Sequence, residues 1–143
     1  MRTITPVLIL LVIAISTSAC GGSDEVVIQD AWARPGFKGD NSAVYLTIIN
    51  PTALRDGLIG AASDVAAVTE IHLSRMDDAG TMTMERQNLV IIPAQGSAEL
   101  SPGGLHVMLA NLMKDLSVGD TFPLTLEFQR AGDITVEVKV KQD

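Results

Sequence analysis

Hydrophobic and polar residues alternate most clearly in the C-terminal part of the chain. Apolar side chains fill every second position of two runs, residues 121–129 and 134–141. They are Phe122, Leu124, Leu126 and Phe128 in the first run, and Ile134, Val136, Val138 and Val140 in the second. A period of two places such side chains on one face of a β-strand. Residues 130–133, which include Gly132, predict the loop of a β-hairpin.

Shorter runs rich in apolar and β-branched residues recur through the rest of the chain. They predict strands at residues 26–33, 43–49, 57–62, 67–73, 82–87, 89–92, 97–100 and 105–109. Turn signals such as Pro35-Gly36 and Asn50-Pro51 separate them. Only residues 110–116 could hold a helical turn, which Gly119-Asp120 would close. Many short strands with turns between them predict an all-β fold, a sandwich or a Greek-key barrel.

The first residues follow the layout of a secretory signal. Arg2 gives a cationic start, residues 7–15 are apolar without interruption, and residues 16–19 are small or polar. The apolar run is shorter than the roughly 20 residues of a membrane-spanning helix. Cys20, the only cysteine, follows where a lipoprotein carries its acylated cysteine, although Thr17 stands where an aliphatic residue is usual. The alternative is simple cleavage that leaves a free cysteine.

These features divide the chain into three parts. We predict a signal peptide at residues 1–19, a flexible tether at 20–25 and one folded domain at 26–143. A signal followed by an acylated Cys20 implies an exported protein of the periplasm or cell envelope, held at a membrane by its lipid. A single cysteine cannot form an intrachain disulfide.

Charge and motifs narrow the class of function. The formal net charge is −7, and lysines and arginines are not clustered, which argues against a nucleic-acid partner. The chain contains no G-x-S-x-G or H-E-x-x-H motif, and its one cysteine precedes the domain. We therefore do not expect an enzyme. Without a cysteine inside the domain, a blue-copper electron-transfer site is not expected either.

Histidine and methionine provide the candidate chemistry. In a strand at 105–109, His106 and Met108 point to the same face. Imidazole and thioether are soft, uncharged ligands that suit copper(I) better than zinc, calcium or magnesium. His72 is the only other histidine, and Met82 and Met84 share a strand face, so either could be the further ligand. Met76 and Met113 are secondary candidates.

Each of these residues also has a structural interpretation. A methionine on a strand is commonly a core residue, and a single histidine can serve only to hydrogen-bond its neighbours. On that interpretation the chain would be a metal-free interaction lipoprotein of the cell envelope. The co-occurrence of both histidines with methionines, in a chain with few of either, favours the metal site.

The spacing of these residues resembles a known family signature. Met84 follows His72 by twelve positions, and the triplet His106-Val107-Met108 begins twenty-two positions after Met84. With the segments 30–35, 43–48, 70–72, 102–109 and 119–124, this resembles the periplasmic copper chaperone (PCuAC-type) family that serves the CuA site of cytochrome c oxidase. The similarity covers residues 26–140.

The resemblance implies a cupredoxin-like Greek-key β-barrel or sandwich and a solvent-near Cu(I) site. The ligands would be His72, Met84, His106 and Met108, which selects Met84 over Met82. The acceptor would be cytochrome c oxidase subunit II or a thioredoxin-like copper assembly factor. Leu73 stands where some members carry methionine, and the sequence ends without their His/Met-rich C-terminal extension. We therefore expect one copper ion per chain.

Overall fold

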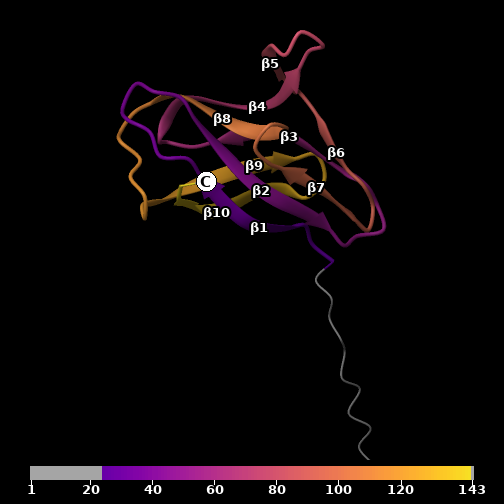
Figure 1. The fold of residues 1–143 in the computed structure, drawn as a ribbon. Coiled ribbons are helices and arrows are strands. Elements are labelled where there is room, and N and C mark those ends of the chain that lie inside the picture. The colour runs from indigo at the N-terminus through magenta and orange to yellow at the C-terminus, as the bar shows by residue number, and fades with distance from the viewer. Residues whose placement is uncertain (1–23, 143) are drawn as a thin grey trace, which may run out of the picture.

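A computed structural model describes residues 24–142, which form ten β-strands and no helix (Figure 1). Cys20, the proposed signal peptide and most of the tether lie outside the described residues. The strands are β1 (Val27–Ala33), β2 (Ser42–Asn50), β3 (Asp56–Ala62), β4 (Ala66–Met76), β5 (Met82–Arg86), β6 (Val90–Ile92), β7 (Gly96–Leu100), β8 (Leu105–Leu112), β9 (Thr121–Phe128) and β10 (Gly132–Val140). Among residues 24–142 there is thus no helix of a length and apolarity that could cross a membrane.

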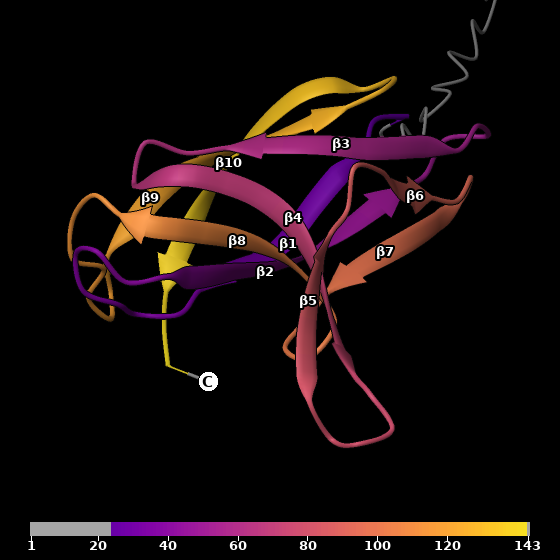
Figure 2. The same ribbon diagram turned by 90° about the horizontal axis from the view of Figure 1, so that it is seen from above.

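The strands form one continuous hydrogen-bonded sheet that folds over itself around a single core. Its order is β5-β4-β8-β2-β1-β10-β9-β3-β6, and β7 pairs with β2 beyond the end of β8. All neighbours are antiparallel except β1 and β10. Figure 2 shows β5 and the end of β4 projecting together from the body of the fold. The all-β prediction is confirmed.

The predicted hairpin at the C-terminus is present, and its alternating side chains form much of the core. Strands β9 and β10 pair in register from Gly132 opposite Phe128 to Lys139 opposite Thr121. Phe122, Leu124, Leu126 and Phe128 are all buried, as are Val138 and Val140. Gly132 begins β10 with a positive φ of 75°, a conformation that glycine adopts without strain.

The prediction that residues 110–116 could hold a helical turn is wrong. Strand β8 continues to Leu112, because Ala110 and Leu112 pair with Val68 and Ala66 of β4. Leu112 enters the core with 1% of its surface exposed. Asn111 keeps its polar side chain outside through a φ of 55°, which asparagine tolerates better than most residues. The remaining residues, 113–116, form a loop that ends in a bridge between Leu116 and Gly36.

A bulge in β1 sets the face on which the chain's only tryptophan lies. The pairing of β1 with β2 shifts between Gln29, opposite Thr47, and Trp32, opposite Tyr45. Asp30 has a φ of 54° within this bulge. The extra residue reverses the alternation, so Trp32 takes the face that Ala31 would otherwise occupy. That face carries the candidate metal ligands.

Candidate metal centre

The two histidines lie directly opposite each other on neighbouring strands. His72 of β4 pairs with His106 of β8, and their ring centroids are 6.0 Å apart. Residues opposite each other in an antiparallel pair share one face of the sheet. The chain thus brings together two imidazoles that are 34 positions apart in sequence.

The methionines flank this pair along the strands. Met108 lies opposite Glu70 and Met84 lies opposite Ser74, so each is two residues from the histidine row, in opposite directions. Two residues correspond to about 7 Å along a strand. Both are on the face of His72, because Glu70 and Ser74 are two positions from it. Met84 is 56% exposed, whereas Met108 is partly buried.

The register also separates Met84 from its neighbour Met82. Met82 pairs with Met76, four residues along β4 from His72, or about 13 Å at the rise of a strand. Met84 is therefore the nearer of the two to the histidines. Met113 lies beyond the end of β8 and is 53% exposed.

His72 is held in one tautomer by a carboxylate. Its Nε2 donates to Glu70 Oε2 at 3.0 Å, because a carboxylate can only accept. Glu70 Oε1 lies 3.2 Å from the Arg86 guanidinium of β5. The hydrogen bond from His72 lowers the pKa of Glu70, with Arg86 adding to the effect. In the neutral ring, Nδ1 then carries a free lone pair.

The Nδ1 atom of His72 has no hydrogen-bond partner in the described part of the protein that would compensate for its burial. It is buried, and no group within the described residues hydrogen-bonds to it. A buried polar atom without a partner costs roughly 1–3 kcal/mol. A metal ion bound there would satisfy it, and a histidine ligand with its other nitrogen on a carboxylate is a common metal-site arrangement.

His106 is also held in one tautomer, in this case by a backbone carbonyl. Its Nδ1 donates to the carbonyl of Gly104 at 3.1 Å, which leaves Nε2 with the lone pair. Only 3% of His106 is exposed, more buried than a solvent-near site suggested. Burial lowers the pKa of His106, so its ring is neutral at neutral pH and does not need to lose a proton before binding a metal.

Aromatic residues extend the row from His106 across the sheet. The Tyr45 ring lies 6.4 Å from His106, and the Trp32 ring lies 4.7 Å from Tyr45. Arg34 sits over the Tyr45 ring at 5.4 Å, and Lys141 over the Trp32 ring at 4.7 Å. No role was predicted from the sequence for these residues or for Glu70, which lies two positions before His72 and therefore on the same strand face.

The donor set restricts the metal. The described residues hold no group of three or more His, Cys, Asp or Glu side chains that could bind a metal ion. A metal at the histidine pair would therefore complete its coordination with thioethers, and these are soft ligands. The residues present fit Cu(I) better than zinc or a hard cation.

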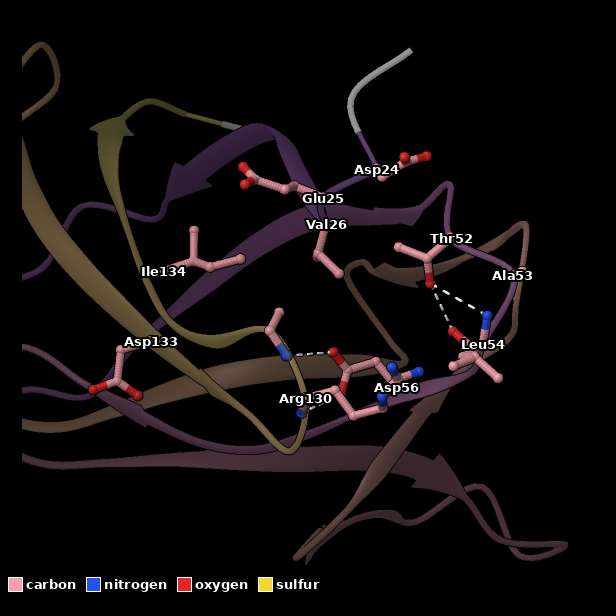
Figure 3. A pocket seen from close by; sticks show the side chains of 11 residues that line it. Asp24, Glu25, Val26, Thr52, Ala53, Leu54, Asp56, Arg130, Asp133 and Ile134 are labelled. Carbon is pink, nitrogen blue, oxygen red and sulfur yellow. Dashed lines mark hydrogen bonds between the residues drawn. The ribbon is translucent and has the colours of Figure 1, made fainter. Parts of the chain in front are cut away.

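A cavity among the described residues lies away from the candidate ligands. It encloses about 550 Å³ between the start of β1, the β2–β3 loop and the β9–β10 hairpin (Figure 3). Its buried acid, Asp56, accepts hydrogen bonds from the backbone of Gly57, Arg130 and Ala131. These bonds fix the hairpin loop to β3. No candidate ligand lines this cavity.

Comparison with known proteins identifies relatives in sequence and in structure. The chain is 32% identical over 116 residues to an uncharacterized protein, RP573, of Rickettsia prowazekii, and the match spans 78% of this chain but 64% of that protein. The copper-bound PCuAC domain from PmoF2 is 26% identical, with a TM-score of 0.69 over 83% of this chain and 94% of that domain. The Cu(I) form of DR1885 from Deinococcus radiodurans is 28% identical, with a TM-score of 0.63 over 86% and 84%.

These structural matches confirm the cupredoxin-like β-sandwich that the resemblance implied. A family model described as "Putative lipoprotein LpqE-like" matches residues 26–140, almost the whole of the predicted domain. The chain belongs to this LpqE-like family, and its domain has the fold of the PCuAC copper chaperones.

Proposed function

We propose that the protein is an envelope copper(I) chaperone, in which His72, Met84, His106 and Met108 bind one Cu(I). The observation that carries this proposal is the buried, unpartnered Nδ1 of His72 beside the ring of His106. The copper-bound state of two domains with the same fold supports it. The family description supports a lipoprotein, and we assign the anchor to Cys20.

The chemistry of the site suits transfer rather than storage. Thioethers are neutral and soft, and can be displaced from Cu(I) one at a time by a stronger donor. Met84 is the exposed ligand and His106 the buried one, so an acceptor would displace Met84 first. By resemblance, we propose that the acceptor is the CuA centre of cytochrome c oxidase subunit II, or a thioredoxin-like assembly factor on the same route.

The binding proposal is tested by competition with a Cu(I)-specific chelator under reducing, anaerobic conditions. The protein carries Cys20→Ser, so that a thiol does not compete for the metal. We expect one tightly bound Cu(I), weaker binding in Met84→Leu, and unchanged binding in the matched control Met113→Leu. If the protein does not withdraw copper from the chelator, the alternative of a metal-free interaction lipoprotein stands instead.

Delivery needs a separate experiment. The Cu(I)-loaded protein is mixed with the copper-free soluble domain of oxidase subunit II, and the two are separated and assayed for copper. Transfer to that domain supports the CuA route. If the loaded protein keeps its copper in this mixture but gives it to a thioredoxin-like factor, that factor would be the direct acceptor.

A further inference from the structure

Three methionines lie on one face of the projecting β4–β5 hairpin. Met76 and Met82 are opposite each other, and Met84 follows two residues after Met82. All three are exposed, at 66%, 49% and 56% of their surface respectively. Core packing, the usual role of methionine, therefore does not account for them.

The other face of the hairpin is polar, which makes the methionine face specific. Thr83 and Glu85 alternate with Met82 and Met84 along β5, and Arg75 precedes Met76 on β4. The methionine face also holds Ser74, opposite Met84, but its three large exposed side chains near the tip are all thioethers. The exposure of these apolar side chains is therefore not explained by packing of the hairpin itself.

The turn at the tip holds the first methionine pair in place. Asp77 Oδ1 accepts hydrogen bonds from the backbone N–H groups of Ala79 at 3.0 Å and Thr81 at 2.8 Å. Gly80 has a φ of 80°, which this turn requires. Directly opposite residues have Cβ atoms about 5 Å apart. Two flexible thioethers at that separation can reach one soft ion between them.

The methionine face continues into the histidine pair. From the tip inward, successive cross-strand rows hold Met76 with Met82, then Met84 with Ser74, then His72. Each step is about 7 Å. We propose that Met76 and Met82 form an acquisition site that binds Cu(I) first and passes it through Met84 to His72 and His106. This relay rests on the proposed copper site, whereas binding at the tip does not.

Each step of the relay is a ligand exchange. One Cu–S or Cu–N bond forms as one Cu–S bond breaks, and copper stays in the +1 state throughout. No proton moves, because thioethers and the free nitrogens of neutral imidazoles carry none to lose. The donor set also strengthens inward, from two thioethers to a site with two imidazoles, so transfer runs from the tip to the histidines.

Silver(I), a redox-inert and diamagnetic probe for Cu(I), tests the first binding step. The Cys20→Ser protein is labelled at its methionine methyl groups and titrated without chloride, with NMR detection. We expect the methyl signals of Met84 and Met108 to move with the first equivalent, and those of Met76 and Met82 with the second. Met113 is the internal control. Movement of Met76 and Met82 only in parallel with Met113 would overturn the acquisition site.

The two proposals fail in different ways in this titration. If the histidine site does not bind, Met108 stays still while Met76 and Met82 still move with the first equivalent. In Met76→Leu/Met82→Leu, which keeps the face apolar, the second event should be lost and the first retained with unchanged affinity.

Kinetics test the relay itself. Stopped-flow uptake of Cu(I) from a weak small-molecule complex should be several-fold slower in Met76→Leu/Met82→Leu than in the Met113→Leu control, with equal final loading. Equal uptake rates would overturn the relay. Equal rates combined with weaker binding of an acceptor protein would assign the methionine face to protein docking instead.

Discussion

Glu70 connects the histidine site to both neighbouring strands. It lies on β4 opposite Met108 of β8, it accepts the Nε2 proton of His72, and it pairs with Arg86 of β5. Removing the carboxylate frees the His72 ring to rotate and to change tautomer. Loss of such a supporting group typically weakens metal binding by about 10–100-fold.

We therefore expect Glu70→Ala to lower the affinity for Cu(I) in a chelator competition. The expected loss is about 10–100-fold, as for other groups that hold a metal ligand in position. Arg86→Ala is the control, because Arg86 is 64% exposed and exposed ion pairs contribute little. Equal losses in the two variants would show that charge around the site, rather than orientation of His72, sets the affinity.

At the scale of residues, the sequence could indicate the candidate donors but not their surroundings. The spacing of His106 and Met108 gave their common face, because strand alternation is local. Preference for Met84 over Met82 depends on the pairing of β4 with β5, which no local pattern contains. The burial of His106 depends on strands far away in the chain, so it could not be predicted.

At the scale of elements, β5 is the only one of the ten described strands that buries none of its residues. All five residues of β5 are exposed. Backbone amides in such a segment exchange with solvent through local opening, whereas those of the buried strands require larger unfolding. A metal held by Met84 of β5 together with His106 of β8 would join the hairpin to the rest of the sheet.

Hydrogen exchange measures this connection. We expect amides of residues 82–86 to exchange faster than those of β9 in the Cys20→Ser protein. One equivalent of silver(I), which fills the proposed histidine site before the tip of the hairpin, should slow their exchange. The loop of the β9–β10 hairpin serves as an unaffected reference. In Met84→Leu the protection of β5 should largely disappear. Equal protection in that variant would remove Met84 from the ligand set.

The strands differ in how far sequence could predict them. Strand β9 was clear because four apolar residues alternate and all enter the core. The last residues of β8 were assigned instead to a stretch that could hold a helical turn, residues 110–116. Pairing of Ala110 and Leu112 with β4 decides the conformation there. The bulge at Asp30 had no local signal at all.

At the scale of the whole molecule, the proposed lipid anchor would decide where the proposed copper site operates. The described domain begins close after Cys20, so an acylated cysteine would hold the site near a membrane surface. We expect the unaltered protein to incorporate labelled palmitate and to sediment with membranes, because a diacylglyceryl group on Cys20 would supply two acyl chains that anchor stably together. Cys20→Ala should lose both properties. Membrane association that persists in Cys20→Ala would contradict the lipid anchor.

Copper binding should also stabilise the whole fold. The proposed ligands come from β4, β5 and β8, and the unfolded chain does not hold them together. An ion that binds only the folded state raises the free energy of unfolding by about 2.7 kcal/mol at a free concentration one hundred times its dissociation constant. Silver(I) permits this measurement without redox reactions, and Cys20→Ser removes a thiol that would otherwise bind it in the unfolded chain.

We expect urea unfolding of the Cys20→Ser protein to shift to higher urea as silver(I) increases, with an unchanged dependence of the unfolding free energy on urea concentration. Met84→Leu should show a smaller shift at the same silver concentration, because one of four ligands is missing. Met113→Leu should behave as the parent does. Equal stabilisation of all three proteins would place the ion away from the β4–β5–β8 face, because only there does the fold hold Met84 close to two histidines.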